Sequence, residues 1–523
     1  MLRVLRNNMQ KVDNVLSNCT NTLAEVSANK GHQVVQRMGA QSMASKVLTE
    51  DTMNVQLKEM EYAVRGQVPI AAERIVQELK SGNSTRPYKE VLFCNIGNPH
   101  SVGQKPISWY REVAALVDCP SLLDKPNTAS VFPADVIARA KELIEAIPGG
   151  TGAYSHSQGI PLIRQHVADF ITKRDGYECD PNNIFLSNGA SAGINLILTT
   201  LISGPKDAVL IPIPQYPLYS ALLTLKGGHH IGYYLDEESN WGLKFEDLVD
   251  AITKARAEGL NPKAMAVINP GNPTGQCMDY DNLVKIVKFC VQEKLVLMAD
   301  EVYQENVYVD TKKFTSLKKV VMDLGDEAKD LELASFHSTS KGFIGECGRR
   351  GGYMELIGFD PYVRDMMMKH ASMELCSNLN GQVMTSLMVK PPASGDESYE
   401  SFQGELNGIK SSLKVKAKQL VDTFNSIEGM TCQPAEGAMY AFPQIHMPQK
   451  ALDAAKAVGQ APDLFYCLAL LEETGICCIP GSGFLQRPGT YHFRTTFLPE
   501  ESKLLEAMDR FKTFHNGFMA KYS

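Results

Sequence analysis

Residues 264–275 read AMAVINPGNPTG, an apolar run followed directly by a loop rich in proline and glycine. The run 264–268 is typical of a buried strand. Two prolines and two glycines within the seven residues 269–275 give the loop a fixed shape, and the amide of Asn272 would project from it as a donor. The segment therefore predicts a strand that is followed by a loop of fixed shape. A turn without a function would rarely need so specific a sequence.

Short apolar runs and longer amphipathic segments alternate from about residue 90 onward. This alternation is typical of an α/β domain in which a mostly parallel sheet lies between helices. The amphipathic segment 281–294 predicts one of these helices. The expected strands of the sheet are residues 184–186, 208–212, 264–268, 294–299 and 331–336.

A different pattern begins after residue 390. One long helix is expected over residues 400–427, and short strands are expected around 438–442, 476–479 and 491–497. This change predicts a second, smaller α+β domain, with Pro391, Pro392 and Gly395 in the link. The expected parts of the chain are an N-terminal segment (1–46), an arm with part of the small domain (47–125), a large domain (126–390) and a C-terminal small domain (391–523).

The composition excludes several classes of protein. The chain has 523 residues, of which 44% are hydrophobic and 21% are charged, as in ordinary globular proteins. It has 52 basic and 59 acidic residues, a net charge of −7, which argues against a general nucleic-acid binder. No apolar run is long enough to predict a membrane-spanning helix.

The 12 cysteines are scattered along the chain. No CxxC pair and no His/Cys cluster with metal-ligand spacing occurs in the sequence. We therefore expect free thiols in a reducing compartment and no metal site.

The N-terminal segment differs in composition from the rest. Through residue 46 it has six basic and two acidic residues, and Leu2, Leu5, Met9, Val12 and Leu16 recur at helical spacing. A helix here would carry an apolar stripe flanked by arginines, which suits a mitochondrial presequence. The alternative is a tail without a targeting function on a cytosolic enzyme.

Two further polar motifs follow expected strands. Residues 187–193 (SNGASAG) form a turn of small residues before a helix, where free backbone N–H groups can bind an anion; the alternative is a tight connection without a ligand. Residues 300–303 (DEVY) place Asp300 at a strand end with Tyr303 three residues later. Such a carboxylate can hold a proton on a heteroaromatic nitrogen, or it can simply cap a helix.

The last motif is 338–342 (STSKG), followed by Arg349 and Arg350. A lysine at a strand end can form a Schiff base with an aldehyde, and nearby hydroxyl and guanidinium groups can bind a phosphate. A single lysine is more often a solvated surface charge. The order of the four motifs overturns that interpretation here.

This order resembles the fold-type I pyridoxal-phosphate aminotransferases over roughly residues 50–520. Within that family, five segments are similar to the alanine aminotransferases: 214–219 (PQYPLY), 336–342 (FHSTSKG), 345–348 (GECG), 437–443 (GAMYAFP) and 480–484 (PGSGF). The resemblance implies a large domain with a mostly parallel sheet, a smaller α+β domain, and pyridoxal 5′-phosphate as the cofactor.

The resemblance also implies residue roles. Lys341 would bind the cofactor aldehyde covalently, and Asp300 would pair with the pyridine nitrogen. Tyr216 would stack on the pyridine ring, and these three are the expected catalytic residues. Asn272 and Tyr303 would contact the ring hydroxyl.

The remaining roles concern the phosphate and the substrate. Backbone groups of Ala190 and Ser191, with Ser338 and Arg350, would bind the phosphate; Arg349 is the alternative arginine. Tyr154 would reach the phosphate from the second subunit of a homodimer. Arg494 would bind the substrate α-carboxylate, with help from Asn272 and the backbone near Gly97.

The resemblance therefore implies a homodimeric alanine:2-oxoglutarate aminotransferase that acts on amino acids and 2-oxo acids. The composition of the N-terminal segment predicts that it is located in the mitochondrial matrix. A glutamate:glyoxylate aminotransferase shares these motifs, although the ending AKYS is no peroxisomal signal. An aminocyclopropane-carboxylate synthase is a lyase alternative. A ligand-sensing regulator would need a DNA-binding module before the fold, and the composition of residues 1–46 does not suit one.

Overall fold

The computed structural model describes residues 46–82 and 85–523. The chain divides into two units, Met1–Lys58 and Glu59–Ser523. The described part of the first unit is residues 46–58, which contain most of helix α2 (Val55–Glu59). The helix expected from Leu2 to Leu16 and the expected presequence lie outside the described residues, apart from residue 46.

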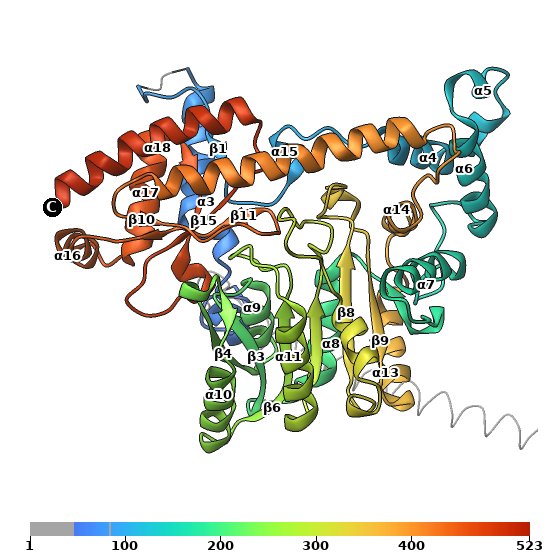
Figure 1. Ribbon diagram of the computed structural model, residues 1–523, viewed down its shortest axis with the longest axis horizontal. Coiled ribbons are helices and arrows are strands. Elements are labelled where there is room, and N and C mark those ends of the chain that lie inside the picture. Colours follow the sequence, from blue (N-terminus) through green and yellow to red (C-terminus); the bar gives the residue numbers. More distant parts are fainter. Residues whose placement is uncertain (1–45, 83–84) are drawn as a thin grey trace, which may run out of the picture. The chain divides into compact units, whose positions relative to one another are not determined.

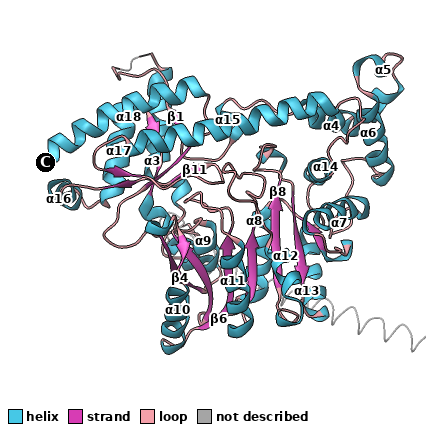
Figure 2. Ribbon diagram, viewed as in Figure 1, coloured by secondary structure: helices cyan, strands magenta, loops and turns pink. Residues whose placement is uncertain are grey.

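Eight strands form the main sheet of the second unit (Figures 1 and 2). In spatial order they are β2 (Ile184–Leu186), β9 (Gly352–Ile357), β8 (Leu333–Ser338), β7 (Val296–Asp300), β6 (Asn261–Ile268), β3 (Asp207–Ile213), β4 (His229–Asp236) and β5 (Gly242–Leu243). Strands β3, β4, β6, β7 and β8 pair in parallel, and β5 and β9 run antiparallel to their neighbours. The expectation of a mostly parallel sheet is confirmed.

Side chains of the central strands alternate between two cores. Ala264, Ala266 and Ile268 of β6 pack in the core that includes α8 (Ala190–Leu201) and α9 (Leu218–Leu225). Met265 and Val267 pack in the core with α10 (Phe245–Ala257), α11 (Tyr280–Glu293) and α12 (Leu317–Leu324). Both faces of the sheet are therefore buried, which is why the strand reads as a continuous apolar run. Truncation of Met265 to alanine would cost about 2–5 kcal/mol of stability.

The boundary between α11 and β7 differs from the expected one. The Asp279 carboxylate caps α11 by accepting the N–H of Asn282 at 3.1 Å, and Lys294 ends the helix with a left-handed φ of 57°. Because this residue turns the chain, β7 begins at Val296 and extends to Asp300. The strand expected at 294–299 is thus shifted toward the carboxylate.

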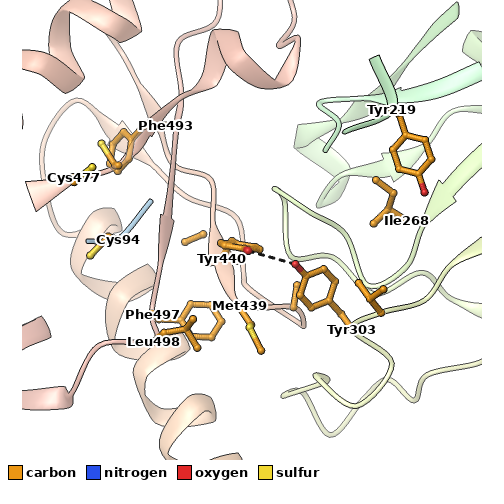
Figure 3. Close-up of a cluster of buried hydrophobic side chains, with 14 of the residues drawn as sticks. Cys94, Tyr219, Ile268, Tyr303, Met439, Tyr440, Cys477, Phe493, Phe497 and Leu498 are labelled. Atoms are coloured by element: carbon orange, nitrogen blue, oxygen red, sulfur yellow. Dashed lines mark hydrogen bonds between the residues drawn. The ribbon is translucent and has the colours of Figure 1, made fainter. Parts of the chain in front are cut away.

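The C-terminal region joins the segment before residue 100. The long helix α15 (Tyr399–Asn425) precedes a three-stranded antiparallel sheet of β11 (Tyr440–Ala441), β15 (Phe493–Thr496) and β14 (Ile479–Pro480). Strand β1 (Leu92–Phe93) pairs in parallel with β13 (Ile476–Cys477). Cys94, Cys477, Phe493, Phe497 and Leu498 pack in one core here (Figure 3). All cysteines among the described residues are free thiols.

The described residues also form further helices, two short strands and several 3₁₀ helices. The remaining helices are α3 (Gln67–Lys80), α4 (Ser108–Asp118), α5 (Thr128–Val131), α6 (Ala134–Ala146), α7 (Pro161–Asp175), α13 (Pro361–Ala371), α14 (Leu379–Val389), α16 (Gln449–Ala457), α17 (Pro462–Thr474) and α18 (Glu501–Tyr522). The remaining strands, β10 (Met430–Thr431) and β12 (Gln444–Ile445), pair antiparallel. Short 3₁₀ helices include η1 (Ala63–Arg65), η2 (Pro99–Val102), η7 (Cys347–Arg349), η8 (Ser372–Glu374) and η9 (Gly481–Phe484).

Candidate active site

A cavity of about 250 Å³ lies at the carboxyl ends of β6, β7 and β8 and at the start of α8. Ligands of open α/β sheets bind at this edge. Among the expected site residues, those that line the cavity are Gly97, Ala190, Ser191, Tyr216, Asn272, Asp300, Tyr303, Ser338, Lys341, Arg350 and Arg494.

Tyr154 is the expected site residue that the structure does not bring to this cavity. Its side chain is 78% exposed, and it lies between α6 and α7. Its expected role depends on a second subunit, so its position in one chain leaves that role a prediction.

Asp300 is the last residue of β7 and points to the α8 side of the sheet. Val296 and Met298 face that side, and Asp300 continues their alternation. Its Oδ2 accepts a hydrogen bond from the Tyr219 hydroxyl at 3.0 Å, and its buried Oδ1 has no partner among the described residues. Burial raises the pKa of Asp300 to about 6, although the bond from Tyr219 opposes the rise. This carboxylate can accept a second, charged donor from the cavity.

The start of α8 and Arg350 form an anion-binding arrangement. Gly189 precedes the helix with φ +77°, and a side chain there would meet Arg350 Nη2 at 2.6 Å. Arg350 Nη2 donates to the carbonyl of Asn188 at 3.0 Å and to Ser191 Oγ at 3.3 Å. Free N–H groups at a helix start and a guanidinium beside them favour a phosphate. Arg349 instead pairs with Glu346, at 3.8 Å.

Lys341 lies in the turn after β8. Its Nζ donates to the carbonyl oxygen of Gly97 at 3.0 Å. Asn306 Oδ1 accepts the N–H of Gly342 at 2.8 Å, and Gly342 has φ +70°. This bond and the bond from Lys341 Nζ hold the turn in place. Lys341 forms no ion pair with a carboxylate within the described residues. An amine held in this way is available for reaction.

The 269–275 loop positions Asn272. Asn269 Oδ1 accepts the N–H of Met278 at 2.9 Å, and the N–H of Gly275 donates to the Gly271 carbonyl at 3.0 Å. These bonds close the loop predicted from its prolines and glycines. Asn272 is buried, and its Oδ1 accepts from Arg494 Nη1 at 3.0 Å.

Arg494 is a buried cation on β15, with 2% of its surface exposed. Its Nη2 donates to the Asn95 carbonyl at 2.5 Å, and its Nε has no partner among the described residues. The structure shows no carboxylate paired with this guanidinium in the described part of the chain. A buried arginine without a resident anion is a ready site for a carboxylate ligand.

The sequence did not predict roles for several residues of the site. Tyr219, which donates to Asp300, and Tyr440, which lines the cavity, belong to the motifs 214–219 and 437–443. Tyr62 also lines the cavity, and its hydroxyl lies 3.2 Å from that of Tyr216. Cys347 lines it too, from the 345–348 motif. The sequence motifs could have indicated these residues, but their individual contacts depend on the fold.

The cavity can bind a ligand with an anionic group near α8 and a protonated nitrogen near Asp300, close to a reactive amine. Arg494 can bind a second, carboxylate-bearing molecule. Within the described residues, no group of three or more His, Cys, Asp or Glu side chains could hold a metal ion. Every helix in residues 46–82 and 85–523 is too short or too polar to cross a membrane.

The fold and the site define an enzyme whose reactive group is a lysine at the edge of an α/β sheet. Residues 125–511 match the family described as aminotransferase class I and II, and the chain belongs to that family. It is an aminotransferase.

Named relatives cover nearly the whole chain. Alanine aminotransferase 1, mitochondrial, of Arabidopsis thaliana is 52% identical over 482 residues, covering 92% of this chain and 89% of that protein. Glutamate–glyoxylate aminotransferase 1 of the same plant is 49% identical over 481 residues, covering 92% and 98%. The solved structure of an alanine aminotransferase from Pyrococcus furiosus has the same fold, with a TM-score of 0.70, 24% identity, and coverage of 89% of this chain and 100% of that chain.

Proposed function

We propose that the protein transfers the amino group between L-alanine and 2-oxoglutarate, giving pyruvate and L-glutamate, with pyridoxal 5′-phosphate as its cofactor. One observation carries this proposal: a single cavity joins the amine of Lys341, a buried Asp300 whose Oδ1 has no partner among the described residues, and a buried Arg494 that pairs with no carboxylate among them. The 52% identity to a protein named alanine aminotransferase supports the choice of substrates.

The residues fit this cofactor at both of its charged ends. The Ala190 and Ser191 backbone, Arg350 and Ser338 would hold the phosphate. The Oδ1 atom of Asp300, which has no partner among the described residues, would accept a hydrogen bond from the protonated pyridine nitrogen.

The cofactor ring would be held by three further side chains. Asn272 and Tyr303 would contact the ring hydroxyl, and Tyr216 would stack on the ring. The Tyr216 hydroxyl is tied to Tyr62 at 3.2 Å, which restricts the ring of Tyr216 to one orientation.

When bound, pyridoxal 5′-phosphate supplies an aldehyde that exchanges amino groups and a ring that withdraws electrons from the substrate Cα. Lys341 would hold this group through its aldehyde, and its Nζ would become a free base when a substrate amine takes its place. Nζ would then take the proton from the substrate Cα and deliver it to the carbon that receives the amino group. Asp300 would keep the ring nitrogen protonated.

Arg494 orients the substrate. Its guanidinium would bind the α-carboxylate of both amino acids, since alanine and glutamate share this group. The fixed carboxylate holds the Cα–H bond in one direction relative to Lys341. The two half-reactions then alternate at the same cavity, which predicts ping-pong kinetics.

A glutamate:glyoxylate aminotransferase is the second candidate, because a relative with that name is 49% identical over nearly the whole chain. Initial rates of purified, cofactor-loaded protein with glutamate as donor and pyruvate or glyoxylate as acceptor separate the two. We expect the higher kcat/KM for pyruvate. A higher value for glyoxylate would transfer the proposal to the second activity, and no turnover of either would refute both.

We also propose that the protein forms a homodimer. Large apolar side chains are exposed near Tyr154: Met373 is 79% and Leu375 is 49% exposed. The two segments are joined, since Ser157 Oγ donates to the Leu375 carbonyl at 2.7 Å. An exposed apolar surface of this kind suits a second copy of the chain, to whose phosphate site Tyr154 would contribute its hydroxyl. Light scattering that reports a monomer would refute the dimer.

We also propose the mitochondrial matrix as the location, with residues 1–46 as the presequence. The basic, acid-poor composition of this segment supports it, as does the word mitochondrial in the name of the Arabidopsis relative. A fusion of residues 1–46 to a fluorescent protein should be imported into mitochondria. A cytosolic signal would favour the alternative location.

A further inference from the structure

Tyr440 lies between two of the cationic groups of the cavity, Lys341 and Arg494. It belongs to β11, in the 437–443 motif, and its side chain is buried. The carbon of the Arg494 guanidinium lies 4.2 Å from the centre of the Tyr440 ring. The Tyr440 hydroxyl accepts a hydrogen bond from the Tyr303 hydroxyl at 3.4 Å (Figure 3). The ring thus touches the expected carboxylate site, and the hydroxyl points toward the sheet.

The hydroxyl also packs against Gly97. A side-chain carbon at Gly97 would collide with the Tyr440 hydroxyl and lie 3.0 Å from Lys341 Nζ. The Gly97 carbonyl accepts the hydrogen bond of Lys341. A continuous set of contacts therefore runs from Arg494 through Tyr440 and Gly97 to Lys341. Although burial opposes it, the positive charges of Lys341 and Arg494 lower the pKa of Tyr440, as this position between two cations requires.

The face of the Tyr440 ring can stabilise the buried guanidinium of Arg494. A buried cation needs compensation, but a carboxylate of the protein would compete with the carboxylate of a substrate. An aromatic face attracts a guanidinium without neutralising it or occupying its N–H edge. Phe484, from the 480–484 motif, adds a second face at 4.8 Å. Arg494 can therefore be stable before substrate binds and still be free to bind it.

We propose that Tyr440 is a positioning residue that holds Arg494 with its ring and, through its hydroxyl against Gly97, sets the carboxylate site relative to Lys341. This inference rests on the proposed function, because it assigns the substrate carboxylate to Arg494. It also gives a role to the 437–443 and 480–484 motifs, which the cofactor contacts do not explain.

The first test separates the ring from the hydroxyl. The dissociation constant of propionate, which has the carboxylate of alanine but no amino group, is measured by absorbance titration of cofactor-loaded protein and by ligand-observed NMR of the cofactor-free protein. In Tyr440→Leu we expect it to rise about tenfold, the loss of a buried cation–π contact. In Tyr440→Phe, which keeps the ring, we expect a change within about threefold. Tyr440→Met replaces the leucine variant if that does not fold, because methionine adapts to irregular space.

Tyr110→Phe is the matched control. Its hydroxyl is buried without a partner among the described residues, and its ring packs in a different core. Propionate binding should be unchanged in this variant. Equal losses in Tyr440→Phe and Tyr440→Leu, or wild-type binding in a folded Tyr440→Leu or Tyr440→Met, would overturn the role of the ring.

The second test addresses the hydroxyl. Gly97→Ala should weaken propionate binding in the wild-type background, because the added methyl group displaces the Tyr440 hydroxyl. In the Tyr440→Phe background the oxygen is gone, so the same change should weaken binding at least threefold less, on the order of one relieved steric overlap. The same loss in both backgrounds would overturn the role of the hydroxyl. Transamination by the wild-type protein is measured separately, so a failure of the proposed function is distinguishable from a failure at Tyr440.

Discussion

Replacement of Arg494 by lysine tests how the protein binds two different amino acids at one site. The change keeps a positive charge on β15 but removes the planar, two-pronged donor. Arg494 Nη1 and Nη2 already hold Asn272 and the Asn95 carbonyl, at 3.0 and 2.5 Å. A lysine ammonium cannot keep both bonds and also bind a carboxylate through two parallel ones.

The expected loss follows from this geometry. A hydrogen bond to a charged group contributes about 1.5–3 kcal/mol, and we expect the loss of one such bond to the substrate. This corresponds to a decrease of about 10- to 150-fold in the rate constant of each half-reaction at low substrate. Alanine and glutamate should be affected alike, because both would present their α-carboxylate to Arg494.

The assay is single-turnover absorbance of the cofactor, with alanine and glutamate measured separately. Arg487→Lys is the control, since Arg487 is a half-exposed arginine that stacks on Tyr234 at 4.6 Å and does not line the cavity. It should leave both rates unchanged. An unchanged alanine half-reaction with a slow glutamate half-reaction in Arg494→Lys would place Arg494 at the distal carboxylate and contradict its assignment to the shared α-carboxylate.

Three further predictions concern Lys341, Asp300 and Tyr219. Lys341→Ala should fold and bind cofactor through phosphate contacts, but its turnover should fall by at least about 100-fold, the usual contribution of a general acid–base group, and a loss within tenfold would refute its role. Burial raises the pKa of Asp300 to about 6 in the cofactor-free protein. Above that pH Asp300 is ionised and can pair with the pyridinium, whereas below it Asp300 must first lose a proton. The dissociation constant for the cofactor should therefore rise about tenfold per pH unit below pH 6. A dissociation constant that equilibrium dialysis finds independent of pH would contradict this. Tyr219→Phe removes the hydrogen bond that lowers the pKa of Asp300, so the onset of weak binding should move to higher pH, and an unmoved onset would show that Tyr219 does not act on this carboxylate.

The sequence predicted the parts of the fold that depend on local pattern. The apolar run 264–268 is buried on both faces in the middle of the sheet, so its composition alone identifies it as a strand. β4 was not predicted, because it begins with the exposed residues His229 and His230 and pairs through only one neighbour along most of its length. β9 was missed because its buried Glu355 interrupts the apolar pattern, and its charge is compensated by Lys318, far away in the sequence.

The candidate site, too, could be predicted from the sequence only in part. Lys341 and Asn272 follow strands and Asp300 ends one, so their convergence could be predicted from the rule that parallel strands end at one edge. Tyr219 and Tyr440 reach their partners only through folding. Tyr219 meets Asp300 across 81 positions of the chain, and Tyr440 meets Tyr303 across 137. No local pattern encodes contacts of that span.

Every role proposed for this site depends on covalent attachment of the cofactor to Lys341. The purified protein is loaded with pyridoxal 5′-phosphate, reduced with borohydride to fix any lysine–cofactor bond, digested, and mapped by mass spectrometry. We expect the phosphopyridoxyl group on the peptide that contains Lys341, and we expect this label to be lost when an excess of alanine is added before reduction. A label on another lysine, or a Lys341 label that alanine does not remove, would contradict it.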